Sequence, residues 1–480
     1  MAVLSYLETV LTSFRCCFKR SAAYHWFVVV ICGLMVRTDH LGVSSVIRGL
    51  GLPGSRYECL IHFFRSTAYS LNKLRKVWYS IVRKSGALYQ INKRNLLIGD
   101  GTKQPKEGRY MPGVKKLFQE SENVSQPSYT FGHMFGGIAA VVERDDSFFA
   151  CPLNMNIQDG LAETAAWKSS QNSDSSHILQ MIRNGHEAAT SLGASYMTLD
   201  RYFLSVSALK ELDKLNETEH LLDLVTRAKD SCVAYEPVPA DNRPKRGRPR
   251  KKGVSVKLRE LFRNRETEFM TATVTMYGEQ QQVKYLCLDL LWGATLYKQL
   301  RFVLVKSKRG RAILVSTDLN MPPELVIETY AHRFKIESMF REFKQQIGGF
   351  CYHFWTKAMP KLDRYKKKGT PDALSMVTDK LLRKRILMAV EATERFVFFS
   401  CIAMGVAQLM ALTPSIAQKA KKHRYLRTRT AGKVSEATIM SYLIKNFYRF
   451  LLLRPDSQLT QIIRQAQMAE VRGTDDHDAA

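Results

Sequence analysis

Five polar residues around position 330 recur at the spacing of an α-helix. Tyr330, Arg333, Glu337, Arg341 and Lys344 follow one another at steps of three, four, four and three. At about 100° per residue, these side chains fall within about 60° of one helix face. One carboxylate among three cations either forms ordinary solvent-exposed ion pairs or belongs to a phosphate-binding site. The helix taken alone favours the ordinary ion pairs.

Two aspartates farther upstream change that balance, because each follows a short apolar run. The run 96–98 leads to Asp100, and the run 195–199 leads to Asp200. Both runs are typical of buried β-strands, so we expect each strand to end at its aspartate. Carboxylates at strand ends face a sheet edge, where Glu337 on a packed helix can join them. We call these three carboxylates the triad.

The triad predicts metal-dependent chemistry on phosphodiesters. Carboxylate oxygens are hard ligands of the kind that Mg²⁺ prefers, and Mn²⁺ can substitute for it. Two such ions about 4 Å apart activate a water or a 3′-hydroxyl and stabilise the leaving oxygen. Arg333, Arg341 and Lys344 would hold the phosphates nearby. The sequence therefore predicts that the triad is both the metal site and the catalytic site.

The charge balance of the chain favours a polyanionic partner. Lys and Arg total 72 against 44 Asp and Glu, a formal net charge of +28. Excess charge of one sign repels itself in the folded state, and nucleic acid is the commonest partner that neutralises it. This argues against a hydrolase that uses paired carboxylates on a sugar. No P-loop is present, so we expect no nucleotide cofactor.

Cysteine usage and hydropathy favour a protein of the reducing cytoplasm. The nine cysteines include no Cys-x-x-Cys pair, which argues against a disulfide scaffold or a zinc knuckle. The apolar run 25–36 is too short to span a bilayer, and 396–412 is interrupted by polar residues. We expect both runs to be buried helices and predict no membrane segment.

The elements that must position the triad suggest a mixed α/β fold in five regions. These are a helical DNA-binding region (1–92), the first part of the catalytic core (93–236), a β-rich insertion with a basic linker (237–320), the second part of the core with the Glu337 helix (321–412), and a basic helical C-terminal region and tail (413–480). The N-terminal helices fit a plain helical cap equally well. Further strands are expected at 136–142, 148–153, 232–235, 269–276, 285–291, 302–305 and 312–315, and helices at 175–192 and 322–346.

Two basic segments are candidate DNA contacts outside the triad. Arg246-Gly-Arg248-Pro249 has the look of an AT-hook, which lays arginines in a narrow minor groove. The alternative is a flexible charged tether to the insertion. The run 419–429 is either a second DNA contact or a solvated helix face.

The helix signature resembles that of a known family. Tyr330-x-x-Arg333-x-x-x-Glu337, followed seven residues later by Lys344, is similar to the Tyr-Arg-Glu-Lys signature of cut-and-paste bacterial insertion-sequence transposases. Phe334 stands where many relatives have tryptophan. Three further stretches look like the family in the correct order, Gly99–Thr102, Leu199–Tyr202 and Ser316–Leu319.

The resemblance implies an RNase H-like core with an Asp-Asp-Glu triad of metal ligands, and a β-rich insertion between the second Asp and the Glu. Tyr330, Arg333 and Lys344 would contact phosphates near the cleaved end. Family members can cleave through a hairpin while an aromatic of the insertion stacks on a flipped base. Trp292 is a candidate for that role, although a core tryptophan in a β-strand is the commoner reading.

The resemblance thus implies a DNA transposase that binds double-stranded transposon ends, cleaves them and joins them to target DNA. Because two ends join in one event, we expect a homodimer on DNA, acting in the bacterial cytoplasm at the nucleoid. Two alternatives stay open. One is a metal-dependent DNA nuclease on the same core, and the other is a catalytically inactive DNA-binding repressor derived from a transposase.

Overall fold

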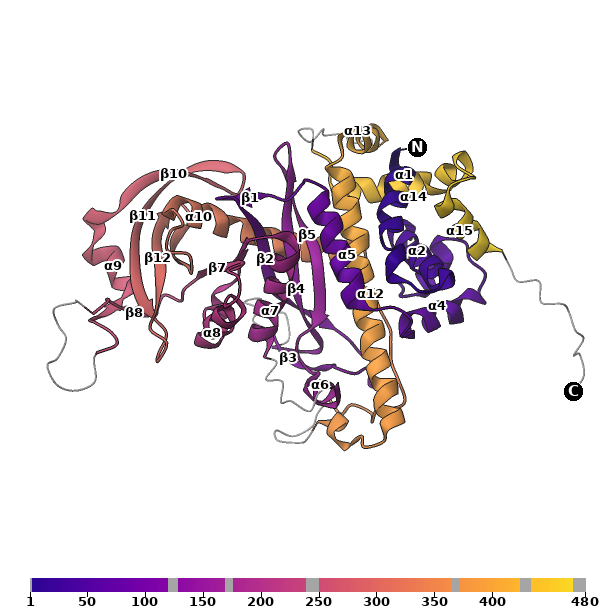
Figure 1. Cartoon of the computed structure of the whole chain (residues 1–480), viewed down its shortest axis with the longest axis horizontal. Helices are drawn as coiled ribbons and strands as arrows, with labels where there is room; N and C mark the ends of the chain where they lie inside the picture. The colour runs from indigo at the N-terminus through magenta and orange to yellow at the C-terminus, as the bar shows by residue number, and fades with distance from the viewer. Residues whose placement is uncertain are drawn as a thin grey trace, which may run out of the picture.

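The chain forms a long molecule in which a β-rich part, a central sheet and a helical block follow one another (Figure 1). This computed structural model describes residues 2–119, 128–168, 176–238, 250–364, 372–423 and 433–468. All thirteen strands that it describes join one mixed sheet. Helices cover both faces of the central part of that sheet, so the predicted mixed α/β fold is confirmed.

Five strands form the central part of the sheet, in the order β5-β4-β2-β6-β7. Their bounds are β2 (Arg94–Pro105), β4 (Tyr129–Arg144), β5 (Ser147–Ile157), β6 (Ser195–Thr198) and β7 (Leu222–Arg227). β4 is antiparallel to both β2 and β5, whereas β6 is parallel to both β2 and β7. Two short strands complete this part: β1 (Gln90–Ile91) pairs with β2, and β3 (Lys115–Phe118) pairs with β4.

Glycines on β2 and β4 show which helix covers which face. A Cβ at Gly101 would lie 2.4 Å from Met134 and 3.2 Å from His177 of α7 (His177–Leu192). A Cβ at Gly137 would lie 3.0 Å from the ring of Phe340 on α11 (Lys335–Gln345). Because side chains alternate along a strand, Asp100 faces α11 rather than α7. α8 (Val206–Leu215) packs against α7. α6 (Ala162–Lys168) lies at the lower end of the molecule in Figure 1.

The predicted strand ending at Asp100 is wrong, because β2 continues five residues farther. β4 keeps pairing with it beyond the end of β6, from Asp100 opposite Gly137 to Pro105 opposite Gly132. The apolar run marked only the stretch that is buried between two neighbours. Asp100 therefore lies within a strand, at the point where one of its two neighbours stops.

The β-rich insertion extends the central sheet. Its strands are β8 (Val233–Tyr235), β9 (Ser255–Lys257), β10 (Met270–Met276), β11 (Glu279–Trp292), β12 (Lys298–Ser307) and β13 (Gly310–Ser316), with α9 (Leu258–Asn264) beside them. β13 pairs antiparallel with β7, Leu314 opposite Arg227. A second hydrophobic cluster, separate from the main core, fills this part. All four strands expected between 269 and 315 are confirmed, whereas β7 was not predicted.

The single helix expected over 322–346 is wrong. The chain forms α10 (Pro323–Ala331), a 3₁₀ turn (His332–Phe334) and α11. At the break, the His332 ring packs 4.9 Å from that of Tyr89 and 5.4 Å from that of Phe148. A mid-helix 3₁₀ turn commonly marks a functional position. With neither Gly nor Pro at the break, the local sequence contained no signal for it.

The helical block is built from both ends of the chain. Its helices are α1 (Ala2–Ser13), α2 (Ser21–Val36), α3 (Ser44–Gly49), α4 (Arg56–Arg65), α5 (Leu71–Lys84), α12 (Lys380–Ala411), α13 (Pro414–His423), α14 (Glu436–Leu453) and α15 (Gln458–Gln467). Helices α1, α2, α4 and α14 pack on one side of α12, whereas β5 packs on the other side together with α5. The sequence predicted 1–92 and 413–480 as separate regions and did not predict that they pack together. The boundaries of these regions stay predictions.

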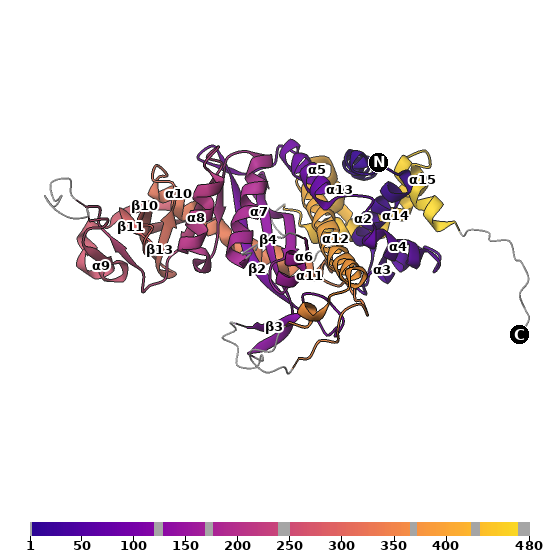
Figure 2. The ribbon, with the colours of Figure 1, turned by 60° about the horizontal axis from the view of Figure 1, so that its bottom comes forward.

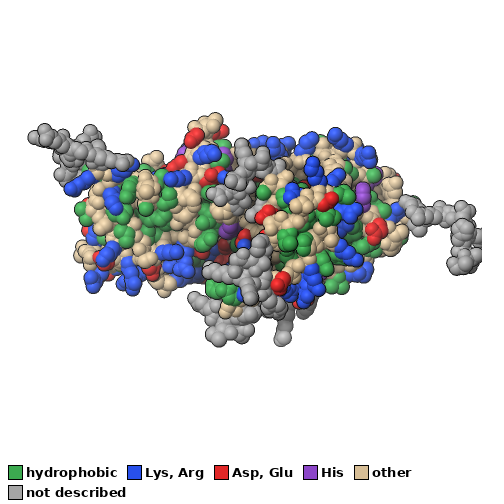
Figure 3. Space-filling model, turned by 90° about the horizontal axis from the view of Figure 1, so that it is seen from below, with side chains coloured by type: hydrophobic (Ala, Val, Ile, Leu, Met, Phe, Trp, Pro, Cys, Tyr) green, Lys and Arg blue, Asp and Glu red, His purple; other side chains and the backbone are tan. Residues whose placement is uncertain are grey.

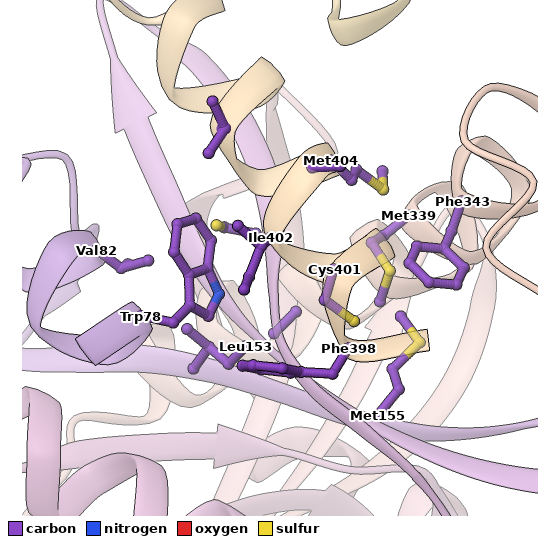
Figure 4. Packing of buried hydrophobic residues seen from close by; sticks show 14 of the residues in the cluster. Trp78, Val82, Leu153, Met155, Met339, Phe343, Phe398, Cys401, Ile402 and Met404 are labelled. Atoms are coloured by element: carbon purple, nitrogen blue, oxygen red, sulfur yellow. The ribbon is translucent and has the colours of Figure 1, made fainter. Parts of the chain in front are cut away.

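Dense packing around α12 joins the block to the sheet. Gly405 leaves room for Trp78 of α5, since a Cβ there would lie 2.3 Å from the indole. The Trp78 indole nitrogen donates to the carbonyl of Pro152 on β5 at 2.9 Å. Trp78 and Leu153 converge with Ile402 of α12 in the same cluster (Figure 4). A large residue at Gly405 would therefore separate the block from the sheet.

The two apolar runs are buried helices, as expected. Residues 27–36 of α2 are buried, and so is α12 from Phe396 to Ala411. No single helix in the described ranges is long and apolar enough to cross a bilayer. One pair, Lys380–Ala411 with Pro414–Lys422, meets the length and composition test only across an 89° bend.

Candidate active site

Strand register puts Asp100 and Asp200 side by side. β2 and β6 are parallel, with Asn95 opposite Ser195 and Ile98 opposite Thr198. Each aspartate follows two residues later, at the same level on strands about 4.8 Å apart. After β6 the chain turns into a short 3₁₀ segment (Arg201–Phe203), and the Thr226 hydroxyl holds the carbonyl of Asp200 at 3.0 Å.

Glu337 reaches the same place from α11. Ile336, Phe340 and Phe343 are buried and dock this helix on the core, which leaves Glu337 on the outer side with 47 % of its side chain exposed. The guanidinium of Arg333 then joins two members of the triad. Its Nη1 lies 3.2 Å from Asp100 Oδ2, and its Nη2 donates to Glu337 Oε1 at 2.5 Å.

The electrostatics of Asp100 reflect crowded carboxylates. Burial raises the pKa of its carboxyl to about 6, while Arg333 and the amide of Gly101 counteract the rise. The negative charges of Asp200 and Glu337 add to it, which places all three carboxylates within electrostatic reach of one another. One arginine for three carboxylates leaves net negative charge at this end of the sheet.

Lys344 and Tyr330 lie around this centre. The Lys344 ammonium donates to Thr102 Oγ1 at 3.1 Å, two residues along β2 from Asp100, and its burial lowers the pKa. Burial raises the pKa of Tyr330 to about 12, and the charge of Asp200 adds to the rise. Both side chains therefore lie in the surroundings of the triad, and their contact with phosphates near the cleaved end stays a prediction.

Other predicted contacts are placed elsewhere or lie outside the described residues. Arg341 is exposed, and its Nε donates to Glu342 Oε1 at 3.1 Å. Trp292 is half-buried at the end of β11, where it packs against the insertion core. Arg246 and Arg248 lie in 239–249, which the structure does not describe, as does most of the run 419–429.

The structure adds two residues that the sequence interpretation missed. Arg227 at the end of β7 and Tyr277 in the β10–β11 turn lie close enough to Tyr330 to perturb its hydroxyl. Tyr277 has a positive φ of 57°, and its ring lies 6.4 Å from that of the exposed Phe334. The Tyr277-Gly278 pair is a turn signal between two strands, but its nearness to the triad depends on the tertiary fold.

The three carboxylates of the triad are the kind of ligand that a hard divalent cation prefers, but they are not arranged closely enough to bind one in this structure. Among the described residues, no three His, Cys, Asp or Glu side chains are close enough to hold a metal ion. However, the Arg333 guanidinium lies between Asp100 and Glu337, so a cation is already held there by two carboxylates. A metal at this place would replace one positive charge by another of higher charge density.

The surface agrees with a polyanionic ligand. Seen from below, Lys and Arg side chains are spread over both halves of the molecule, with fewer Asp and Glu side chains among them (Figure 3). This matches the formal net charge of +28.

Comparison with known families identifies the superfamily of the chain. A family model described as DDE superfamily endonuclease matches residues 13–282, more than half of the chain. The chain belongs to the DDE superfamily endonuclease family. The matched span includes Asp100 and Asp200 and ends before Glu337. No curated protein matches the chain to a significant degree.

Membership confirms the resemblance to this superfamily and the RNase H-like interpretation of the core. It makes the chain an enzyme of the transposase or nuclease type with DNA as its substrate. Divalent metals are the general requirement of the family.

Proposed function

We propose that this DDE superfamily endonuclease is the transposase of an insertion sequence, which cuts double-stranded DNA at the element's ends and joins them to target DNA. One observation carries the proposal: Asp100 of β2 and Glu337 of α11, far apart in sequence, share the guanidinium of Arg333 beside Asp200. Three carboxylates brought together on a strongly basic protein fit phosphoryl transfer better than a role in stabilising the fold.

The triad would hold the metal, Mg²⁺ with Mn²⁺ as a substitute, and when bound this group lowers the pKa of the attacking hydroxyl and stabilises the leaving oxygen. The chain's own residues bind and orient the DNA. Lys344 holds a phosphate oxygen through its ammonium, and the Tyr330 hydroxyl, protonated at neutral pH, donates to another. Arg333 supplies positive charge where the phosphate becomes more negative.

Joining requires that the 3′-hydroxyl released by cleavage attacks a second phosphodiester. The new ester bond forms as the bond to the target's leaving 3′-oxygen breaks, so the number of phosphodiesters is conserved without a covalent enzyme intermediate. Two ends must be held for one insertion event, and a homodimer on DNA is therefore part of the proposal, as is action in the bacterial cytoplasm.

The test is a cleavage and joining assay on linear DNA that carries the ends of the flanking element and a supercoiled target plasmid. Products are resolved with Mg²⁺, with Mn²⁺ and with EDTA. Metal-dependent cuts at the ends and covalent end–target products support the proposal. Cuts without joining would instead make the chain a nuclease, and specific binding without cuts would make it a DNA-binding repressor.

A further inference from the structure

Two aromatic side chains are left exposed at the end of the β3–β4 hairpin. Phe118 and Tyr129 retain 54 % and 49 % exposure, and their ring centroids are 5.4 Å apart at an angle of 66°. The ammonium of Lys116 lies 4.2 Å from the centroid of the Tyr129 ring. Exposed rings beside a cation suit a ligand that carries both negative charge and flat or apolar surface.

This aromatic pair lies on the same face of the sheet as the catalytic carboxylates. Phe118 is opposite Tyr129 on β4, and Asp100 is opposite Gly137 on the same strand. Tyr129 and Gly137 are an even number of residues apart, so they share the face that α11 covers. Eight residues of strand span at most about 26 Å, which corresponds to about eight base pairs of duplex DNA.

The chain around the pair is strongly basic. We call segments 103–118 and 352–364 the basic lobe, which carries eight cations and two acids: Lys103, Lys106, Arg109, Lys115, Lys116, Lys357, Lys361 and Arg364 against Glu107 and Asp363. The two segments are joined by hydrogen bonds, such as that from the Arg364 guanidinium to the carbonyl of Glu107. β3 lies at the lower end of the central sheet in two views (Figures 1 and 2).

The basic lobe contains a hollow that suits a phosphate group. It has a volume of about 250 Å³ and is lined by Arg109, Lys361, Leu362, Asp363 and Arg364. The Arg364 guanidinium also lies 5.3 Å from the ring centroid of Phe131, which is two residues from Tyr129 on the same face. Two cation–ring contacts, Arg364 with Phe131 and Lys116 with Tyr129, therefore lie next to each other on the hairpin.

We propose that the basic lobe and the Phe118–Tyr129 pair bind the duplex that enters the active site, with the pair contacting the DNA six to eight base pairs (~20–26 Å) from the cleaved phosphate. The inference rests on the proposed function and adds the location of the bound DNA. Lysines and arginines neutralise the backbone, while the rings pack on bases or wedge into the minor groove. Lys115 pairs with Asp159 and Lys106 donates to the carbonyls of Phe350 and Tyr352, but the remaining cations still outnumber the acids of the basic lobe. A protein partner therefore fits less well, because it would have to be acidic.

The decisive experiment is site-specific crosslinking in the full-length protein with Glu337→Gln, which leaves the DNA uncut. A photoreactive phenylalanine analogue replaces Phe118 or, separately, Tyr129, and the crosslinked nucleotide on the element's end is mapped. The expected crosslinks fall six to eight base pairs from the cleavage position, within the ~26 Å reach. The same analogue at Tyr448, which is 46 % exposed on α14, is the matched control.

Binding measurements supply an independent readout. Phe118→Ala combined with Tyr129→Ala is expected to weaken binding of the end duplex about tenfold, as loss of base contacts with aromatic side chains does. Lys116→Gln and Lys361→Gln should each lower the slope of log Kd against log salt by about one. Lys445→Gln, an exposed lysine on α14, should change neither value by more than about a tenth of these effects.

The outcomes separate this inference from the proposed function. Crosslinks at another distance, or unchanged affinity in the double variant, would overturn the surface assignment while end cleavage by the parent protein stands. If the parent protein neither binds nor cuts the element's ends, the proposed function fails first. Circular dichroism and thermal unfolding of each variant establish that its fold is intact.

Discussion

Both ends of the parallel strands β2, β6 and β7 carry carboxylates, but those at one end are fully paired and those at the other end are not. At the amino-terminal end, the Asp223 side chain is only 2 % exposed and fully paired. Its oxygens accept from Arg94 and Thr317 at 2.6 Å each and contact His220 Nε2 at 2.7 Å. At the carboxyl-terminal end, Asp100 and Glu337 of the triad share one arginine, Arg333, and both carboxylate side chains remain partly exposed.

The number of partners that each carboxylate already has, rather than the volume of the neighbouring hollow, distinguishes a structural cluster from a reactive one. A hollow of about 510 Å³ opens at the amino-terminal end, next to Tyr196 and Asp318. There, Asp318 accepts from the Tyr196 hydroxyl at 2.7 Å and from the Asn320 amide at 2.8 Å, and Asp223 has three partners, so the oxygens of both carboxylates are already engaged. The triad, in contrast, keeps net negative charge that a cation can neutralise.

The largest expected effect is loss of chemistry at the unsaturated end. Asp200→Ala and Glu337→Ala should each lower single-turnover cleavage of the element's ends by about 10³-fold or more, because several kcal/mol of metal-mediated stabilisation are lost. Affinity for the same DNA in EDTA should change less than about threefold, since no phosphate contact is removed. If a variant retains a tenth of the parent rate, the carboxylate that it lacks is not one of the catalytic three.

At the saturated end the same kind of change should destabilise the fold. Asp223→Ala leaves Arg94 buried without its carboxylate, and the free energy of unfolding is expected to fall by about 3–5 kcal/mol. Asp200→Ala should stay within about 0.5 kcal/mol of the parent. Urea unfolding followed by circular dichroism measures both variants, and equal losses would erase the distinction between the two ends.

The pH dependence of stability should show that the ionised carboxylate of Asp100 destabilises the folded protein. The pKa of Asp100 rises from 3.8 to about 6 on folding, so between these values the folded protein binds a proton that the unfolded chain releases. Stability therefore falls as pH rises through this window. In EDTA, Asp100→Asn should be about 2 kcal/mol more stable than the parent at pH 7.5 and equal to it near pH 4. A difference independent of pH would contradict this origin.

The smallest expected effect distinguishes Lys344 from Arg341, which the helical spacing places on the same face. Lys344→Gln should lower cleavage about tenfold, since its ammonium lies two residues along β2 from Asp100 and loses one charged hydrogen bond. Arg341→Gln should stay within about twofold, because its guanidinium is exposed beside Glu342. Matched single-turnover rates decide, and similar losses for both would place Arg341 at the DNA as well.

Local patterns determined much of this protein. Apolar runs located β6 and most strands of the insertion, and the spacing of Arg333, Glu337 and Lys344 put them on one side of the chain around α11. Strong net charge pointed to a polyanion. These features depend on near neighbours in sequence, because side-chain periodicity and burial act within a single strand or helix.

Only the tertiary structure decided how those pieces combine. β2 runs past Asp100 because β4 continues to pair with it, and the 3₁₀ turn at His332–Phe334 forms where rings from 89 and 148 pack. Whether an aspartate is saturated, as Asp223 is, or crowded and reactive, as Asp100 is, depends on partners more than one hundred residues away. Pairing of that kind is a property of the packed sheet, and no local propensity encodes it.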